Sequence, residues 1–307
     1  MDIYLPIAEV SVNAPLLVAL GLFVGFISGM FGIGGGFLMT PMLVFLGIPP
    51  AVAVASMSNH VAASSMSSVI AYGRRRAVDL RMGGVLAAGG VVGAFAGVEL
   101  FRWLRLLGQA DLVVAVSYLL FLGVIGGLML TESLGAILRR RRGEPPPPRR
   151  DRRPVWLYGL PLKMRFPRSR LYISVIPPLA LGAFVGVLSA IMGVGGGFIL
   201  VPAMVYLLRM PAGVVVGTSL LQIIVTTALT GVLQAGRNQT VDVVLAMLLL
   251  AGGIVGAQYG ARASQRFRAE ELRAVLALIV LLVGLRMGLG LFITPDEPFM
   301  LMTGMHG

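Results

Sequence analysis

The chain has 307 residues, of which 57% are hydrophobic and only 12% are charged. Because soluble domains carry about 25% charged residues, this composition excludes an ordinary water-soluble enzyme. The net charge of +12 indicates nucleic-acid binding when it occurs in a soluble domain, but the cations here cluster around apolar segments, and we expect a bilayer rather than a nucleic acid as the partner.

The first half of the chain predicts a long, glycine-broken apolar stretch followed by plainer membrane segments. No Asp, Glu, Lys or Arg occurs between Glu9 and Arg74. Residues 14–48 form one apolar stretch, which as a single helix would be about 52 Å long at 1.5 Å per residue. The hydrocarbon core is about 30 Å thick, so one straight crossing does not contain this stretch. Three further segments are expected at 51–73, 82–101 and 112–137.

A polar linker separates the two halves. Twelve of the 25 Lys and Arg residues lie in 139–170, which also contains the run Pro145 to Pro148. Consecutive prolines cannot form a helix. Since Arg and Lys concentrate in cytoplasmic loops, we place this linker in the cytoplasm, with binding of an anionic lipid or a protein partner as the alternative reason for its charge.

The second half repeats the first. Residues 25–41 read GFISGMFGIGGGFLMTP, and residues 186–202, at an offset of 161, read GVLSAIMGVGGGFILVP. After a two-residue shift, Asp79 meets Asp242. We therefore divide the chain into a first transmembrane repeat at 1–138, the linker at 139–170 and a second repeat at 171–307, with segments expected at 172–208, 212–236, 241–261 and 272–293.

The distribution of arginines favours two passes for each broken stretch. With five segments in each half, the repeats are inverted, and 21 cations lie on the side of the linker against three on the other side, Arg102, Arg105 and Arg237. With four segments in each half the repeats are parallel, and the balance is weaker. The expected fold is thus an all-α polytopic membrane protein with two homologous repeats, 8 to 10 membrane segments and a glycine-broken or re-entrant first segment in each repeat.

The two triple-glycine clusters are the first candidate site. Irregular backbone survives in a bilayer only where it is buried in protein or lines a wet cavity. A break leaves free N–H groups at the start of the following half-helix, whose dipole end is partly positive, so it binds an anion without a charged side chain. Close packing of helices is the alternative use of glycine, and we assign it to Gly21, Gly25, Gly93 and Gly97. The candidate substrate-binding glycines are Gly32, Gly34, Gly35, Gly36, Gly193, Gly195, Gly196 and Gly197.

An unusually polar segment follows each break. Polar side chains inside a membrane face the protein interior or a cavity, and hydroxyls and amides donate hydrogen bonds to an anion without adding charge. Interhelical hydrogen bonding is the alternative role. The polar residues closest to the breaks are Ser58, Asn59, Thr218, Ser219 and Gln222, and we add them to the candidate binding site.

Three titratable residues lie within or beside the apolar segments, and the first of them has two interpretations. His60 suits a proton relay, because its ordinary pKa is near neutrality, or it is a neutral histidine hydrogen-bonded within the bundle. Its position in the second repeat is occupied by Leu221. For Asp79 and Asp242, at matched helix starts, we expect capping of backbone N–H groups. The sequence has no cysteine, and we expect neither a metal nor another cofactor.

The duplicated pattern GxxSGxxGxGGGFLxxPxL, present as Gly25 to Leu43 and in variant form as Gly186 to Met204, resembles the TauE/SafE family of sulfite exporters and related anion permeases, as does GTSL at 217–220. The resemblance implies a multi-pass inner-membrane protein that moves sulfite, sulfoacetate or another organosulfur anion. Families of this kind are described with seven or eight spans from a duplicated four-span unit.

We therefore expect a secondary transporter, not an enzyme, that exports a small sulfur oxyanion or organosulfonate by alternating access. An anion channel would share the glycine breaks, and a membrane-embedded enzyme has only His60 and a nearby serine to use. Whether the chain forms a homo-oligomer stays open at this point.

Overall fold

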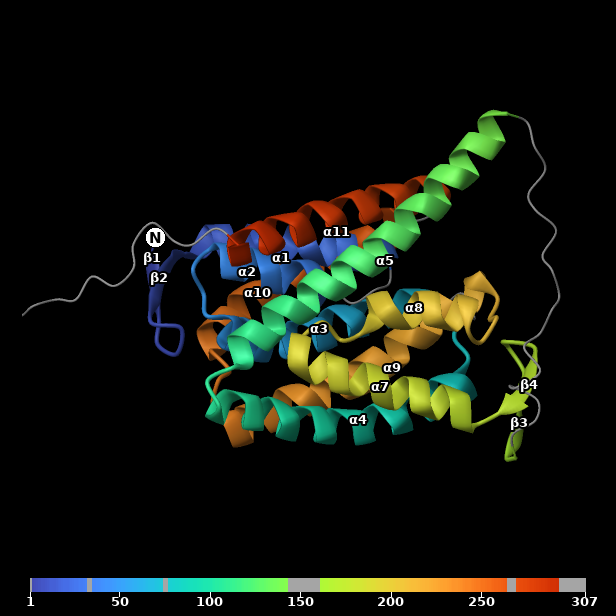
Figure 1. Ribbon diagram of the computed structural model, residues 1–307, viewed down its shortest axis with the longest axis horizontal. Helices are drawn as coiled ribbons and strands as arrows, with labels where there is room; N and C mark the ends of the chain where they lie inside the picture. Colours follow the sequence, from blue (N-terminus) through green and yellow to red (C-terminus); the bar gives the residue numbers. More distant parts are fainter. Residues whose placement is uncertain (1, 32–34, 74–76, 143–160, 264–268, 293–307) are drawn as a thin grey trace, which may run out of the picture.

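The computed structural model describes residues 2–31, 35–73, 77–142, 161–263 and 269–292, and these form a bundle of helices with a small β-hairpin at each end (Figure 1). Within these ranges, five helical stretches are long and apolar enough to cross a membrane, and four shorter apolar helices accompany them. The prediction of a helical membrane protein is therefore confirmed. The two hairpins were not predicted.

The described residues of the first half form one hairpin and five helices. Strands β1 (Asp2–Leu5) and β2 (Val10–Asn13) pair antiparallel, with Asp2 opposite Asn13. The predicted break divides the stretch 14–48 into two helices. The three helices that follow extend beyond the predicted segments at 51–73, 82–101 and 112–137. The helices are α1 (Ala14–Phe31), α2 (Gly36–Phe45), α3 (Pro50–Gly73), α4 (Leu80–Leu106) and α5 (Ala110–Arg141).

The second half has the same order of elements. Strands β3 (Lys163–Phe166) and β4 (Leu171–Ser174) pair antiparallel. The predicted linker at 139–170 therefore includes the end of α5 and the whole of β3. A short π-helical segment, η1 (Gln234–Asn238), extends α9. The helices are α7 (Ile176–Met192), α8 (Gly197–Tyr206), α9 (Ala212–Leu233), α10 (Val243–Ala263) and α11 (Ala269–Phe292).

The hairpins extend the internal repeat to the start of the chain. Residues 2–13 and 163–174 correspond at the same offset of 161, and Pro6 of the first turn matches Pro167 of the second. Glu9 and Arg170, which also correspond, both have left-handed backbone, with φ of 55° and 51°. The two hairpins nevertheless lie at opposite ends of the bundle (Figure 1).

The helices of the two halves are interleaved. Helix α1 packs along α10 of the other half, and α7 packs along α4 in the corresponding way. Helices α3 and α9 pack on each other, and so do α5 and α11, which lie side by side at one face of the bundle (Figure 1). Each half therefore completes its core with helices from the other half.

Small residues make this interleaving possible. A Cβ atom added to Gly25 of α1 would lie 2.4 Å from the Gly253 carbonyl oxygen, and one added to Gly93 of α4 would lie 2.0 Å from the Ala183 carbonyl oxygen. Such backbone contacts are typical of helix association in membranes, where small residues let helices approach closely. The packing role expected for these glycines is confirmed.

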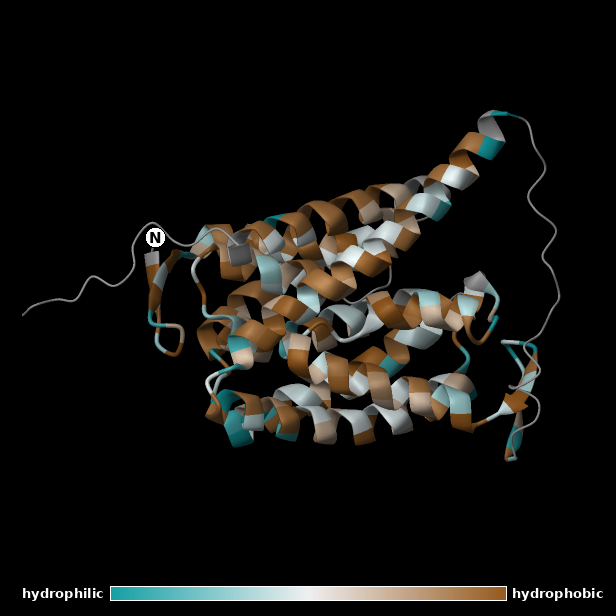
Figure 2. Ribbon diagram, viewed as in Figure 1, coloured by the Kyte–Doolittle hydropathy of each residue, from teal (hydrophilic) through white to brown (hydrophobic). Residues whose placement is uncertain are grey.

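The outer surface suits a lipid environment. Large apolar side chains such as Phe23, Trp103, Leu128, Met247 and Leu285 are exposed, and hydrophobic residues predominate along the helices (Figure 2). Soluble monomers rarely expose such extended apolar area. The outer faces are thus solvated by lipid chains rather than by water.

A buried carboxylate fastens each hairpin to the opposite half. Asp79 Oδ1 accepts hydrogen bonds from the N–H groups of Arg81 and Met82 (both 3.2 Å) at the start of α4, as capping requires. Its Oδ2 accepts from the Ser169 N–H (2.9 Å) and Oγ–H (2.7 Å) in the turn between β3 and β4. The Asp79 N–H in turn donates to Thr218 Oγ1 of α9 (3.0 Å).

Asp242 makes the corresponding contacts at the other end. Its Oδ1 accepts from the Leu245 N–H (3.0 Å) at the start of α10, and its Oδ2 accepts from the Ile7 N–H (3.0 Å) in the turn between β1 and β2. The Asp242 N–H donates to Ser56 Oγ of α3 (3.0 Å). The predicted capping role is confirmed for both aspartates, and each also joins a hairpin to a polar central helix.

Candidate anion-binding site

The second glycine cluster forms a sharp turn between α7 and α8. Gly193 ends α7 in left-handed conformation (φ 68°), and its N–H donates to the Ser189 carbonyl (2.8 Å). Gly195 and Gly196 also have positive φ, 73° and 72°, a region that costs other residues about 1–2 kcal/mol. Residues 193–197 are all buried. The run of glycines thus serves to reverse the chain inside the protein.

The described part of the first cluster has the same form. Gly35 precedes α2 with φ 62°, as Gly196 precedes α8. Neither glycine offers a side-chain cap, and the first helical hydrogen bonds are donated by residues three and four positions later. Each half-helix therefore begins with N–H groups that the helix itself does not use. Two predicted site residues, Gly32 and Gly34, lie outside the described residues.

The two half-helices begin next to each other. The rings of Phe37 and Phe198, the second residues of α2 and α8, stack with centroids 5.8 Å apart at an interplanar angle of 28°. A Cβ atom on Gly36 would lie 2.7 Å from the Gly193 carbonyl oxygen and 2.8 Å from Val194 Cα. The partly positive ends of α2 and α8 thus converge at the centre of the bundle.

Two serines beside the breaks have unused hydroxyls. Ser28 in α1 and Ser189 in α7 occupy corresponding positions, are fully buried, and have no hydrogen-bond partner for Oγ among the described residues. A Cβ atom on Gly35 would lie 3.2 Å from Ser28 Oγ, so this hydroxyl lies at the start of α2. A buried hydroxyl without a partner costs free energy, which makes these two groups candidates for ligand contact.

Most of the predicted polar residues contact protein groups. The hydroxyls of Ser58 and Ser219 donate to carbonyls of their own helices, and Thr218 Oγ1 joins its helix to Asp79. Asn59 lies against Gly231 of α9, since a Cβ there would meet its Oδ1.

Gln222 retains an unused acceptor. Its Nε2 donates to Thr226 Oγ1 (2.9 Å), while its buried Oε1 has no partner in the described chain. Of the five side chains that the sequence places near the breaks, this one keeps a free polar atom in the interior.

His60 lies between α3 and α10. Its Nδ1 is 3.0 Å from the Leu249 carbonyl oxygen, and the ring is fully buried against Gly253, where a Cβ would overlap it. Its Nε2 has no partner in the ranges that the structure covers. The contact to Leu249 is of the kind expected for a structural histidine, and the unused Nε2 leaves the relay hypothesis open to experiment.

Sequence reasoning missed Tyr118. This residue of α5 is fully buried, and its hydroxyl donates to the carbonyl of Met192 (2.7 Å), the last residue of α7, with the Gly36 carbonyl oxygen at 3.5 Å. One side chain thus contacts backbone on both sides of the paired breaks. The only signal was a tyrosine within an otherwise apolar helix. Ser28 and Ser189 were visible as a matched pair in the repeat.

Comparison with known proteins identifies relatives over almost the whole chain. The sequence matches the sulfite exporter TauE/SafE family over residues 17–287. It is 28% identical over 271 residues to the probable membrane transporter protein YjnA of Bacillus subtilis, covering 88% of this chain and 98% of that one. It is 30% identical over 270 residues to a probable membrane transporter protein of Xylella fastidiosa, covering 85% and 90%.

A more distant relative carries the family name. The chain is 29% identical over 123 residues to sulfite exporter TauE/SafE family protein 3 of Arabidopsis thaliana, covering 39% of this chain and 26% of that one. No solved structure has significant similarity to the chain. With its apolar helices, its paired glycine breaks and a family match that spans both halves, the chain is a multi-pass membrane protein that belongs to the TauE/SafE family.

Proposed function

We propose that this protein is a secondary transporter that exports a small sulfur oxyanion or organosulfonate, of the sulfite or sulfoacetate class. The observation that carries the proposal is the convergence of the starts of α2 and α8, where Phe37 stacks on Phe198 and Ser28 and Ser189 hold unused hydroxyls. Helix N-termini bind anions through their N–H groups. Tetrahedral or pyramidal oxyanions present several acceptor oxygens to such donors.

The site as proposed has no cationic side chain. Backbone N–H groups from Gly36 and Gly197 onward and the two serine hydroxyls are neutral donors, whereas the unused Oε1 of Gln222 is an acceptor. A neutral site binds an anion weakly enough to release it after each turnover, whereas a buried arginine would hold it more tightly through charge-assisted bonds. Binding by half-helix termini near the membrane midplane is a general feature of transporters with inverted repeats.

The proposed topology is five plus five inverted segments. Arg105 and Arg237 lie at the end of the bundle that holds β1–β2, where they contact the Asn238 carbonyl and Glu99. Arg81 and Arg168 lie at the other end, with β3–β4. By the positive-inside rule, the end with β3–β4 faces the cytoplasm, at the inner membrane of a bacterial-type cell, and both termini face outward.

The burial of the breaks supports a mechanism of alternating access. Residues 35, 36 and 193–197 are buried, so an anion reaches them only when packed helices separate. The hairpin contacts of Asp79 and of Asp242, which we call the two clamps, lie at opposite ends of the bundle. In the proposed cycle one repeat rocks against the other, so that the site opens first to one side of the membrane and then to the other. Export of an anion down an inside-negative potential releases about 2.3 kcal/mol per charge per 100 mV, without a coupling ion.

Flux through proteoliposomes tests the proposal. We expect saturable efflux of sulfite or sulfoacetate with counterflow, and loss of flux in Gly195→Leu, whose side chain would meet Val61, Ile223 and Thr227. Gly213→Leu, at an exposed helical glycine with nothing within 4 Å of an added Cβ, is the matched control. Non-saturable flux without counterflow would indicate an anion channel instead, and absence of flux for every oxyanion would refute the proposal.

A further inference from the structure

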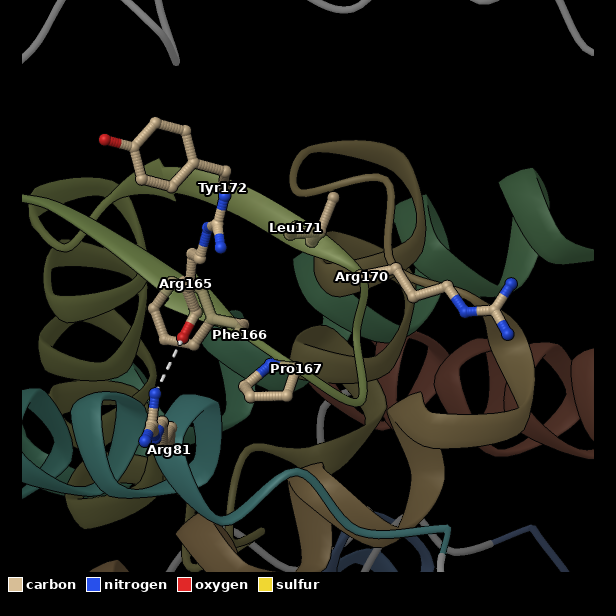
Figure 3. A pocket seen from close by; sticks show the side chains of 7 residues that line it. All are labelled: Arg81, Arg165, Phe166, Pro167, Arg170, Leu171 and Tyr172. Atoms are coloured by element: carbon tan, nitrogen blue, oxygen red, sulfur yellow. Dashed lines mark hydrogen bonds between the residues drawn. The ribbon is translucent and has the colours of Figure 1, made fainter.

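The turn of the β3–β4 hairpin and the start of α4 enclose a basic pocket. Its cavity is about 420 Å³ and open to solvent, within the roughly 300–1,000 Å³ of small-molecule sites, and its lining residues are shown in Figure 3. Arg81 donates to the Arg165 carbonyl oxygen (3.5 Å), which places both guanidinium-bearing chains on one side of the hairpin, while Arg170 extends from the other side of the turn (Figure 3). The lining residues are Arg81, Arg165, Phe166, Pro167, Arg170, Leu171 and Tyr172.

Among the described residues, no carboxylate forms an ion pair with the arginines of this pocket. In the part of the chain that the structure describes, both ion pairs involve Glu99, which lies at the C-terminal part of α4. Arg81, Arg165 and Arg170 therefore have no carboxylate partner within the described ranges, and all three are exposed. Figure 3 shows that the Arg170 guanidinium extends away from the other two, so Arg81 and Arg165 are the candidate phosphate ligands. Arginine binds phosphate through charge-assisted and often bidentate hydrogen bonds.

The β1–β2 hairpin of the first repeat matches the β3–β4 hairpin in fold but not in charge. The β1–β2 hairpin has the same register, the same proline and the same left-handed residue, yet its positions corresponding to Lys163, Arg165 and Arg170 are Asp2, Tyr4 and Glu9. The position corresponding to Arg81 in α10 is Val244, at the offset that aligns Asp79 with Asp242.

The β1–β2 hairpin thus has the same fold without basic residues at these positions. We infer that the arginines of β3–β4 have a role other than folding. A topological signal accounts for positive charge at this end of the bundle. It does not require the arginines to line a cavity.

We propose that this basic pocket binds the phosphate group of an anionic phospholipid from the leaflet on the linker side. The surroundings favour a lipid over a soluble phosphate. Leu162, Met164 and Tyr172 are exposed on the same hairpin, at 71%, 38% and 51%, and apolar side chains with a tyrosine are typical of the membrane interface. Basic pockets at the cytoplasmic ends of membrane helices bind anionic headgroups.

The bound phosphate would act on the start of α4. Arg81 lies in the first turn of α4, two residues after Asp79, and Ser169 in the hairpin turn donates twice to the Asp79 carboxylate. A headgroup held by Arg81 and Arg165 therefore ties the hairpin more firmly to the helix that Asp79 caps. This inference does not depend on which anion the protein transports.

Lipid binding to the purified full chain tests the pocket. We expect native mass spectrometry to detect phosphatidylglycerol bound in preference to phosphatidylcholine, and the double variant Arg81→Gln/Arg165→Gln to lose about tenfold in affinity, because two guanidinium contacts are removed. Arg139→Gln is the matched control, since Arg139 is an exposed arginine of the same end whose Nε donates to its own helix. Equal binding of the two lipids, or an unchanged affinity in the double variant, would overturn the proposal.

Two further arms make the result specific. The double variant Arg81→Lys/Arg165→Lys keeps the charge, and with it the topological signal, but lacks the bidentate geometry of arginine, so its affinity is expected between those of the parent and the glutamine variant. Parental affinity in the lysine variant would show diffuse attraction and overturn the pocket. Inorganic phosphate alone should not displace phosphatidylglycerol at equal concentration, and displacement would overturn the assignment to a lipid.

Discussion

Removal of the Asp79 carboxylate should destabilise the protein more than removal of any exposed acid. In Asp79→Ala, the Arg81 and Met82 N–H groups lose their cap, and the buried Ser169 N–H and Oγ–H lose their acceptor. Loss of a cap costs about 1 kcal/mol, and each hydrogen bond to a charged acceptor contributes about 1.5–3 kcal/mol. We count the cap and the Ser169 N–H and leave out Ser169 Oγ–H, because a hydroxyl can rotate, and so expect a total loss of about 2.5–4 kcal/mol in the free energy of unfolding.

Chemical denaturation of the purified protein in detergent measures this loss. Asp242→Ala removes the acceptor of the Ile7 and Leu245 N–H groups, and should cost about 2.5–4 kcal/mol by the same values. Asp111→Ala, at the exposed start of α5, is the control and should cost less than about 1 kcal/mol. A loss below about 1 kcal/mol in the free energy of unfolding of Asp79→Ala would refute the role of these Asp79 contacts in stability.

Three further predictions follow from packing, polar contact and topology. Gly25→Val should cost about 3 kcal/mol through overpacking, because its Cβ would lie 2.4 Å from a backbone oxygen, whereas Gly127→Ala, with nothing within 4 Å, should leave the unfolding midpoint unchanged or raise it. Tyr118→Phe should lower stability by about 1–3 kcal/mol, because the buried Met192 carbonyl loses its donor; an unchanged midpoint would show that the contact is dispensable. Since the chain has no cysteine, a single cysteine replacing Tyr4 or Tyr172 reports the topology. A membrane-impermeant thiol reagent should label the cysteine at position 4 in intact cells and the one at position 172 only after permeabilisation. Labelling of both from one side would refute the inverted arrangement.

The sequence allowed the helical segments to be predicted because their signals are local. The apolar run between Glu9 and Arg74 and the triple glycines at 34–36 and 195–197 indicate where helices run and where they break, through residue-level preferences. The capping of α4 and α10 by Asp79 and Asp242 was likewise evident from position. These features depend on neighbours in the chain rather than on the tertiary fold.

The hairpins and the centre of the site depend on contacts between distant residues. Strand β1 has only four residues, and its apolar pattern is too short to predict a strand. An isolated two-stranded hairpin is also only marginally stable in water. It forms here because Leu5 is buried and the Ile7 N–H donates to Asp242, 235 residues away. The stacking of Phe37 on Phe198 and the contact of Tyr118 with Met192 are of the same non-local kind, so pattern alone did not reveal them.

The side-chain part of the predicted site shows why proximity in sequence is a weak guide. Ser58 and Thr218 are close to the breaks along the chain, but helical geometry lets their hydroxyls donate to carbonyls four residues earlier. Ser28 and Ser189 precede the breaks, and the reversal of the chain at the left-handed glycines brings Ser28 beside Gly35. The turn therefore decides which hydroxyls remain available.

Sulfite efflux from proteoliposomes by the double variant Ser28→Ala/Ser189→Ala tests the central claim most directly. Both hydroxyls lack partners among the described residues, so the unfolding midpoint should not fall, while the loss of two hydrogen bonds to a bound anion should raise the KM by about tenfold or more. Ser64→Ala, whose hydroxyl donates to the Val61 carbonyl, should leave the KM unchanged. A parental KM in the double variant would contradict an anion site at the paired glycine breaks.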